Sequence, residues 1–92
     1  MPAGRYPIVG MKYYVYVLES EKDKRWYKGH TVDIDKRIIE HNTGKTKSTK
    51  GFIPWRLVYF EVFETREEAI QRERYFKTGS GREFLKKIIM AT

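Results

Sequence analysis

The sequence contains no cysteine among its 92 residues. It therefore cannot form a disulfide, a thiolate metal site or a cysteine nucleophile. Any metal ion would have to be bound by carboxylate, imidazole or hydroxyl groups. Long apolar runs are absent as well: the longest, such as Leu57–Phe60, fall far short of the roughly 20 residues that a membrane-spanning helix needs. The leader MPAGRYPIVG also lacks the apolar region of a signal peptide. We therefore expect a cytoplasmic protein with no membrane partner.

Acidic residues are scarce relative to basic ones. There are 12 Asp and Glu against 19 Lys and Arg, which gives a net charge of +7. Such an excess favours a polyanionic partner, because basic side chains neutralise phosphates and release their counterions. We expect nucleic acid, most simply DNA. The alternative is a docking surface for an acidic protein or an anionic membrane.

The chain length allows one small domain with one core. Strand-like patterning begins just after Met11, so we expect an arm over residues 1–11 and a domain over residues 12–90. β-branched, aromatic and helix-capping patterns predict strands over 13–18, 25–30 and 56–63 and helices over 34–42, 65–77 and 80–90, with a long loop over 43–55. Capping boxes are expected at Thr65 and Ser80, with Gly79 separating the last two helices. The predicted fold class is α+β, a three-stranded, mainly antiparallel sheet flanked by helices in the order β-β-α-loop-β-α-α.

Glu73 lies on or beside the inward face of the helix predicted over 65–77, because Ala69, Glu73 and Phe76 follow i, i+4, i+7 spacing. Burying a carboxylate is costly unless a cation or several donors hold its charge. Either a divalent cation or an arginine, Arg37 or Arg72, could do so. The pattern leaves both alternatives open.

Arg37 and His41 are four residues apart and share one face of the helix over 34–42, whose apolar stripe is Ile34, Ile38 and Ile39. A guanidinium binds phosphate oxygens bidentately, and an imidazole can move a proton near neutral pH. These residues suit phosphoryl chemistry. The alternative is a solvated helix face.

Two tyrosines on neighbouring strands are further candidates. Alternation places Tyr14, Tyr16 and Leu18 on one face of the first strand, and Tyr27 lies near Gly29 on the second. A phenol near a cation could act as a base or position a water molecule. Simple packing in the sheet is the alternative.

The loop after the first helix carries basic residues and no acid. We predict that it follows a phosphate backbone and stacks a base through residues such as Trp55. The alternative is a mobile loop with solvated lysines. The predicted nucleic-acid contacts are Lys45, Lys47, Lys50 and Arg56.

These residues follow one another in a pattern that resembles the GIY-YIG nuclease superfamily. The pattern is Tyr14-Val15-Tyr16, then Tyr27-Lys28-Gly29, then Arg37 with His41, and finally Arg72-Glu73 in a later helix. Stretches such as Pro54–Tyr59 resemble the small stand-alone bacterial members. The resemblance extends from about residue 12 to residue 87.

The resemblance implies a nuclease in which Glu73 binds one Mg²⁺ or Mn²⁺, Arg37 binds the scissile phosphate, and Tyr16 or Tyr27 activates water with help from His41. Tyr16 is the favoured base. His30, where some relatives carry lysine, is a candidate phosphate contact.

Two positions depart from the family pattern: Tyr14 replaces its first glycine and Lys28 its central isoleucine. Because no residues remain for an appended DNA-binding domain, we expect an endonuclease of low sequence specificity. The alternative is a module of the same fold that binds nucleic acid without cutting it, and a protein partner stays open.

Overall fold

The computed structural model describes residues 11–91, so the arm predicted over residues 1–11 lies outside the described residues except for Met11. The elements are β1 (Tyr13–Ser20), β2 (Trp26–Thr31), α2 (Ile34–Asn42), the 3-10 helix η2 (Lys50–Phe52), β3 (Trp55–Phe63), α3 (Arg66–Phe76) and α4 (Gly79–Ile89). This order confirms the predicted α+β class. The strands form one antiparallel sheet in the order β2-β1-β3.

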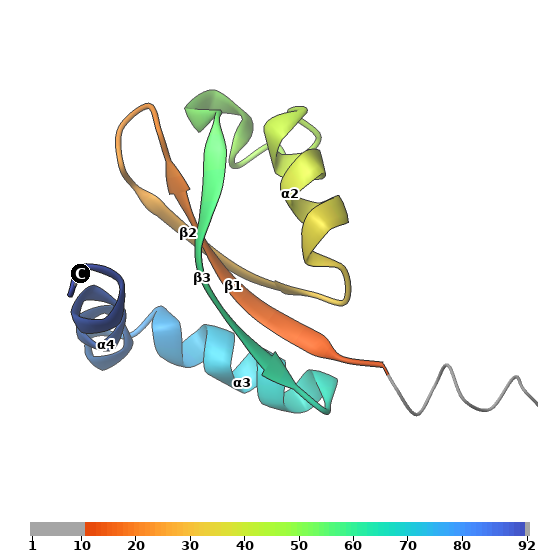
Figure 1. Ribbon diagram of the computed structural model, residues 1–92, viewed down its shortest axis with the longest axis vertical. Helices are drawn as coiled ribbons and strands as arrows, with labels where there is room; N and C mark the ends of the chain where they lie inside the picture. The colour runs from red at the N-terminus through yellow and green to blue at the C-terminus, as the bar shows by residue number, and fades with distance from the viewer. Residues whose placement is uncertain (1–10, 92) are drawn as a thin grey trace, which may run out of the picture.

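β1 is the central strand because its side chains are apolar on both faces. Val15 and Val17 pack with α3 and α4, whereas Tyr16 and Leu18 pack with α2 on the opposite face. Figure 1 shows α2 on one side of the sheet and α3 with α4 on the other. The sheet thus separates two small cores. β2 is an edge strand, and side chains can approach it from both faces of the sheet.

Two apolar clusters form these cores. On the α3 and α4 face, Ala69, Phe76 and Leu85 are buried against β1. On the α2 face, Trp55 is buried, with Ile34 and Ile38 packed against it. Ile39, predicted to belong to the same stripe, is instead 62% exposed, because it lies five residues after Ile34 and the helical rotation turns it away from the sheet.

The helix termini largely follow the predicted capping. Asp33 caps α2, and Thr65 forms a complete capping box with Glu68 at the start of α3. The predicted cap at Ser80 is wrong, because the N-cap of α4 is Thr78, two residues earlier. Gly79 therefore lies inside α4 and does not separate two helices.

The segment between α2 and β3 is closely tied to the rest of the chain. Asn42 exchanges two hydrogen bonds with the Trp55 backbone, at 2.9 and 2.6 Å, and the Ser20 hydroxyl donates to the Phe52 carbonyl at 2.6 Å. Trp55 is only 3% exposed and donates its indole N–H to the Thr49 carbonyl. Trp55 is therefore not available to stack a base.

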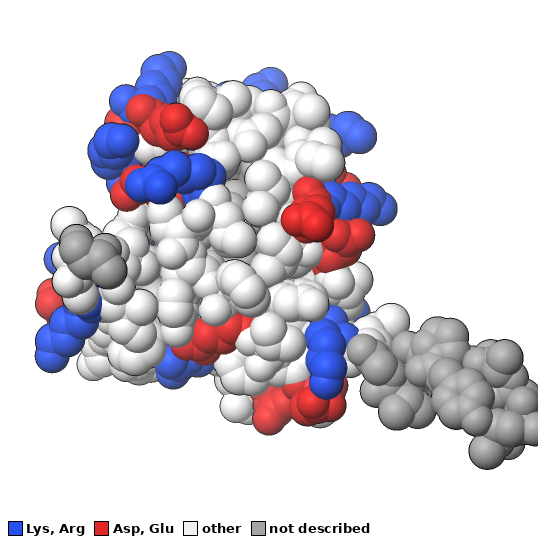
Figure 2. Space-filling model, viewed as in Figure 1, with Lys and Arg blue, Asp and Glu red and all other residues white. Residues whose placement is uncertain are grey.

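In the face of the molecule seen in Figure 2, charged side chains lie mostly around the margin, and much of the centre is uncharged. β3 crosses this region in Figure 1, and its Phe60 and Val62 are each 47% exposed. Within residues 11–91, no helix has the length and apolar content to span a membrane.

Candidate active site

α2 holds Arg37 and His41 at different depths. His41 is fully buried, whereas Arg37 is partly exposed. The alternative of a solvated helix face is thus wrong for His41, whose ring packs 4.8 Å from the ring of Tyr27, centre to centre. His41 can reach a substrate only through another side chain.

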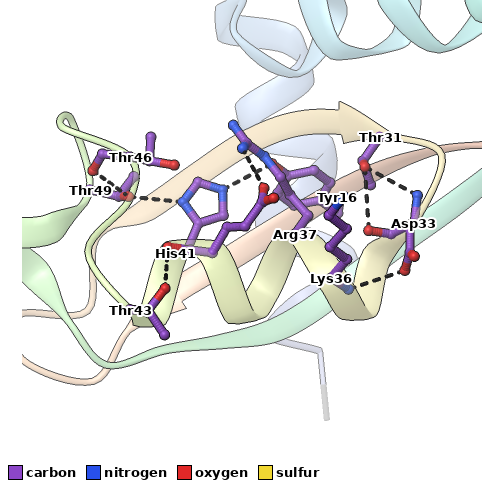
Figure 3. A network of polar contacts seen from close by, with 10 residues as sticks. Tyr16, Thr31, Asp33, Lys36, Arg37, His41, Thr43, Thr46 and Thr49 are labelled. Carbon is purple, nitrogen blue, oxygen red and sulfur yellow. Dashed lines mark hydrogen bonds and ion pairs between the residues drawn. The ribbon is translucent and has the colours of Figure 1, made fainter.

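A chain of hydrogen bonds joins Arg37, Tyr16, His41 and Thr49 (Figure 3). Arg37 Nε lies 3.3 Å from the Tyr16 hydroxyl, which lies 3.0 Å from His41 Nε2. On the other side of the ring, His41 Nδ1 lies 2.8 Å from Thr49 Oγ1, and Thr49 donates to the Thr46 carbonyl at 3.3 Å. No buried side-chain nitrogen or oxygen atom of these residues therefore lacks a partner.

The direction of these bonds follows from their two ends. The Thr49 hydroxyl donates its hydrogen bond to the Thr46 carbonyl. Its oxygen therefore accepts a hydrogen bond from His41 Nδ1. His41 Nε2 is then an acceptor, and the Tyr16 hydroxyl donates to it. The Tyr16 oxygen in turn accepts from Arg37, a donor only. Tyr16 therefore presents its lone pairs, not its proton, toward Arg37.

The same packing sets the protonation states. Burial, followed by the positive charge of Arg37, lowers the pKa of the His41 imidazole, which keeps the ring neutral. Burial raises the pKa of the Tyr16 phenol to about 12, against the lowering effect of the Arg37 hydrogen bond. The negative charge of Glu73 also contributes to raising it. Tyr16 is thus a neutral phenol at pH 7.

Gly29 makes room for Tyr16. It lies opposite Tyr16 in the antiparallel register, and a Cβ at Gly29 would lie 2.6 Å from the Tyr16 hydroxyl oxygen. The Tyr16 phenol therefore occupies the space that a side chain at position 29 would take. Any side chain at position 29 would push Tyr16 away from Arg37 and His41.

Glu73 approaches β2 from the opposite face of the sheet. Its carboxylate accepts from His30 Nδ1 at 2.5 Å and from Lys77 Nζ at 2.6 Å. Neither Arg37 nor Arg72 is its partner, since Arg72 binds Glu61 at 2.8 Å. Burial, the largest influence, would raise the pKa of Glu73, but the hydrogen bonds from Lys77 and His30 outweigh it and leave the pKa below its ordinary value. Glu73 is therefore an anion at neutral pH.

A hollow of about 460 Å³ connects the two sides of the site. It lies between the turn after β2, α2 and the first residue of α3, and it is lined by His30, Lys36, Arg37 and Arg66 with the acids Asp33 and Glu40. His30 and Arg37 thus share one hollow although they lie on opposite faces of the sheet. Glu73 is joined to this hollow through His30, and Tyr16 through Arg37. Tyr27 lies further in, with its ring 6.3 Å from that of Tyr16.

Glu73 is the carboxylate predicted to bind a metal ion. Among residues 11–91 there is no cluster of three or more His, Asp or Glu side chains that could hold one. A hard cation such as Mg²⁺ can be bound through one carboxylate with water and substrate phosphate completing its shell. The ionised Glu73 fits that requirement, although Lys77 and His30 compete for both of its oxygens.

The predicted nucleic-acid contacts lie in several different surroundings. Lys45, Lys47 and Lys50 are exposed on the segment after α2. Arg56 is paired with Glu19 at 2.8 Å, and His30 is bound to Glu73. His30 therefore has one ring nitrogen left for a phosphate.

Sequence analysis missed four residues of the site. Glu40 binds Arg37 at 2.9 Å, and Lys77 binds Glu73; both could be inferred from their i,i+3 and i,i+4 spacing. Thr49 and Arg66 carry no such signal, because their contacts join elements that are distant in the sequence.

Comparison with known proteins places the chain in a family. The model of the GIY-YIG catalytic domain matches residues 12–87. The chain belongs to the GIY-YIG family. The match runs from the start of β1 to residue 87 in α4, and so it includes Tyr16, Arg37, His41 and Glu73.

Relatives of this GIY-YIG domain occur in several bacteria. The UPF0213 protein SSP2268 of Staphylococcus saprophyticus is 46% identical over 78 residues, covering 84% of this chain and 94% of its own. The UPF0213 protein BH0048 of Halalkalibacterium halodurans is 47% identical over 73 residues, covering 78% of this chain and 77% of its own. The solution NMR structure of BH0048, from Bacillus halodurans, covers 85% of each chain with a TM-score of 0.53 and 41% identity. Membership therefore indicates the nuclease family, and these names specify no substrate.

Proposed function

We propose that this GIY-YIG domain is a metal-dependent endonuclease that hydrolyses phosphodiester bonds of DNA with low sequence specificity. The observation that carries the proposal is that Arg37 and Glu73 approach β2 from opposite faces of the sheet and are linked to the same hollow. Arg37, held by Tyr16 and Glu40, lines the hollow from one face of the sheet. His30 lines the same hollow from the other face and joins it to the Glu73 carboxylate.

Arg37 is suited to bind the scissile phosphate. Its Nε and Nη1 donate to Tyr16 and Glu40, which fixes the plane of the guanidinium and leaves Nη2 for a phosphate oxygen. These two hydrogen bonds also raise the pKa of Arg37 further above its already high ordinary value. The side chain therefore keeps its charge throughout the reaction.

Tyr16 and His41 provide a path for the proton of the attacking water. Tyr16 is 1% exposed, so the water would have to lie beside Arg37, whose Nε is 3.3 Å from the Tyr16 oxygen. As that oxygen accepts a proton from the water, the Tyr16 proton can pass to His41 Nε2 along the chain of hydrogen bonds. His41 acts through Tyr16 and is a positioning residue. Tyr27, half-buried beside both rings, remains the alternative base.

Glu73 would hold the divalent cation, Mg²⁺ or Mn²⁺. When bound, such an ion stabilises negative charge on phosphate oxygens and lowers the pKa of bound water. The residues around Glu73 contribute by keeping its carboxylate ionised and pointed toward β2.

The experiment is nicking of supercoiled plasmid and cutting of branched DNA in Mg²⁺ or Mn²⁺. We expect wild type to cut, and Glu73→Gln and Arg37→Ala to lose at least about a hundredfold in rate. Glu67→Gln and Arg74→Ala change exposed side chains of α3 and serve as matched controls that should cut normally. Full cleavage by either site variant would overturn the proposal.

A second candidate function is a module that binds nucleic acid without cutting it. It is favoured by one observation, that both carboxylate oxygens of Glu73 are already engaged by Lys77 and His30. This candidate predicts salt-sensitive DNA binding by wild type and no cleavage with either metal.

A further inference from the structure

A row of basic side chains continues from the hollow past Glu73. Lys28 and His30 lie on one face of β2, because side chains alternate along a strand, and they are opposite Val17 and Val15 in the register. Those valines face α3 and α4. Glu73 binds His30 with one oxygen and Lys77, at the end of α3, with the other. Arg82 follows in the first turn of α4.

Lys28 is unusual within this row. It is half-buried, and no hydrogen bond or ion pair engages its ammonium within the described part of the chain. Burial, followed by the charges of Arg82 and Lys77, lowers its pKa. Three cations therefore lie near one another, and only Lys77 has an acidic partner, which is Glu73. An anion bound here would relieve both the repulsion and the burial.

We propose that Lys28, Lys77 and Arg82 form a phosphate-binding surface for the backbone of duplex DNA, on the opposite side of Glu73 from Arg66. This inference rests on the proposed function and assigns the course of its substrate across the protein. The backbone would pass Arg66 and Arg37, meet Glu73, and continue over β2 and the junction of α3 with α4.

The dimensions of α3 fit several phosphates of one strand. Arg66 and Lys77 are the residues at its two ends, and at 1.5 Å per residue they lie about 16 Å apart along the axis. One strand of duplex DNA carries a phosphate about every 3.4 Å of axis. The surface could therefore follow roughly five base pairs, with Glu73 between its two basic ends.

The composition of this row favours a duplex over a single strand. It contains Lys28, His30, Arg66, Lys77 and Arg82. The aromatic residue on the same face of β2, Trp26, packs against the core and donates its indole N–H to Glu19 at 3.1 Å, so its ring is engaged within the protein and less suited to stack an unpaired base. The opposite edge of the sheet, β3, exposes the apolar side chains of Phe60 and Val62 as well as Arg56, which is paired with Glu19, and the centre of the face seen in Figure 2 carries little charge. Phosphate contacts alone are thus expected at the β2 edge.

The test measures binding of the full chain to a 20-base-pair duplex and to one of its strands, over a range of NaCl concentrations and with EDTA to prevent cleavage. Wild type is compared with the double variant Lys28→Met/Arg82→Gln. Lys77 is left unchanged because it also holds Glu73. The matched control is Lys22→Met/Lys87→Gln, which removes two exposed charges away from the row.

For the duplex, each lost phosphate contact should reduce the slope of log K against log salt by about 0.9, so the double variant should lose nearly two. The control should keep the wild-type slope. An unchanged slope in the double variant, or an equal loss in the control, would overturn the proposal, as would tighter binding of the single strand than of the duplex.

This outcome is independent of cleavage. A reduced slope in a protein that cuts nothing would support the surface and contradict the nuclease. Cleavage by a protein whose salt slope is unchanged in the double variant would support the nuclease and contradict the phosphate-binding surface. Should Lys28→Met fail to fold by circular dichroism, Arg82→Gln alone changes an exposed residue and should still reduce the slope by about one.

Discussion

Thr49 determines which nitrogen of His41 carries a proton. Its hydroxyl donates to the Thr46 carbonyl and can only accept from His41 Nδ1, which leaves Nε2 as the acceptor for Tyr16. A residue far from the substrate thus orients the phenol beside Arg37.

We predict that Thr49→Val, which has nearly the same shape, lowers the free energy of unfolding by about 1–3 kcal/mol because it leaves the buried Nδ1 without a partner. Thr49→Val should also slow cleavage, whereas Thr49→Ser should retain both the stability and the cleavage rate of wild type. Urea unfolding and single-turnover cleavage measure these effects.

The tautomer itself can be observed by ¹⁵N NMR of the imidazole. The hydrogen-bond directions require wild-type His41 to be protonated at Nδ1, and Thr49→Val to shift that population. A wild-type ring protonated at Nε2 would contradict the proposed direction of the chain, whatever the activity.

At the scale of elements, the junction between α3 and α4 depends on a close backbone approach. A Cβ at Gly81 would lie only 1.8 Å from the Tyr75 carbonyl oxygen, so no rotation of a side chain can relieve the clash. Gly79, two residues earlier in the same helix, has nothing within 4 Å of its Cβ position.

We therefore predict that Gly81→Ala destabilises the fold by about 3 kcal/mol or more, while Gly79→Ala leaves its stability nearly unchanged. Thermal and urea unfolding give the comparison. Equal stabilities of the two variants would show that α4 can shift freely on α3.

The elements also show which features of the fold could be predicted from sequence patterns. Local signals correctly predicted the strands, α2 and the Thr65 capping box, because capping and periodicity depend on residues a few positions apart. The start of α4 was predicted wrongly because Ser80 and Glu83 match a capping box, whereas Thr78 supplies the cap in the structure.

Long-range contacts of the site were beyond such patterns. His30 and Glu73 are 43 residues apart, and only the packing of α3 on β2 brings them together. The burial of His41 depended likewise on Thr49 and the segment after α2. The family resemblance supplied candidate residues, whereas their depth and partners required the fold.

At the scale of the whole molecule, half-buried carboxylates couple stability to pH. Glu61 on β3 receives two hydrogen bonds from Arg72 on α3, at 2.8 and 3.1 Å. Burial would raise its pKa, but the bonds from Arg72 and Tyr59 outweigh it and lower the pKa. A lowered pKa in the folded state contributes stability above the ordinary carboxyl range, and this stability is lost as pH falls through the folded value.

We predict that Glu61→Gln lowers stability at pH 7 by about 2 kcal/mol and makes its decline in acid less steep. Glu67→Gln, at an exposed position, is the control. Denaturant unfolding between pH 7 and pH 3 measures both curves, and parallel curves for wild type and Glu61→Gln would show that this ion pair does not link α3 to the sheet.

The central claim is that Arg37 and Glu73 act in one site although they approach β2 from opposite faces of the sheet. The most direct test is single-turnover cleavage of plasmid DNA in Mn²⁺ by wild type, Arg37→Ala, Glu73→Gln and the double variant. Residues that act as a unit give strongly non-additive losses, so we predict that the double variant is hardly slower than the slower single variant. Losses that multiply in the double variant, or single variants that cut as well as wild type, would contradict a shared site.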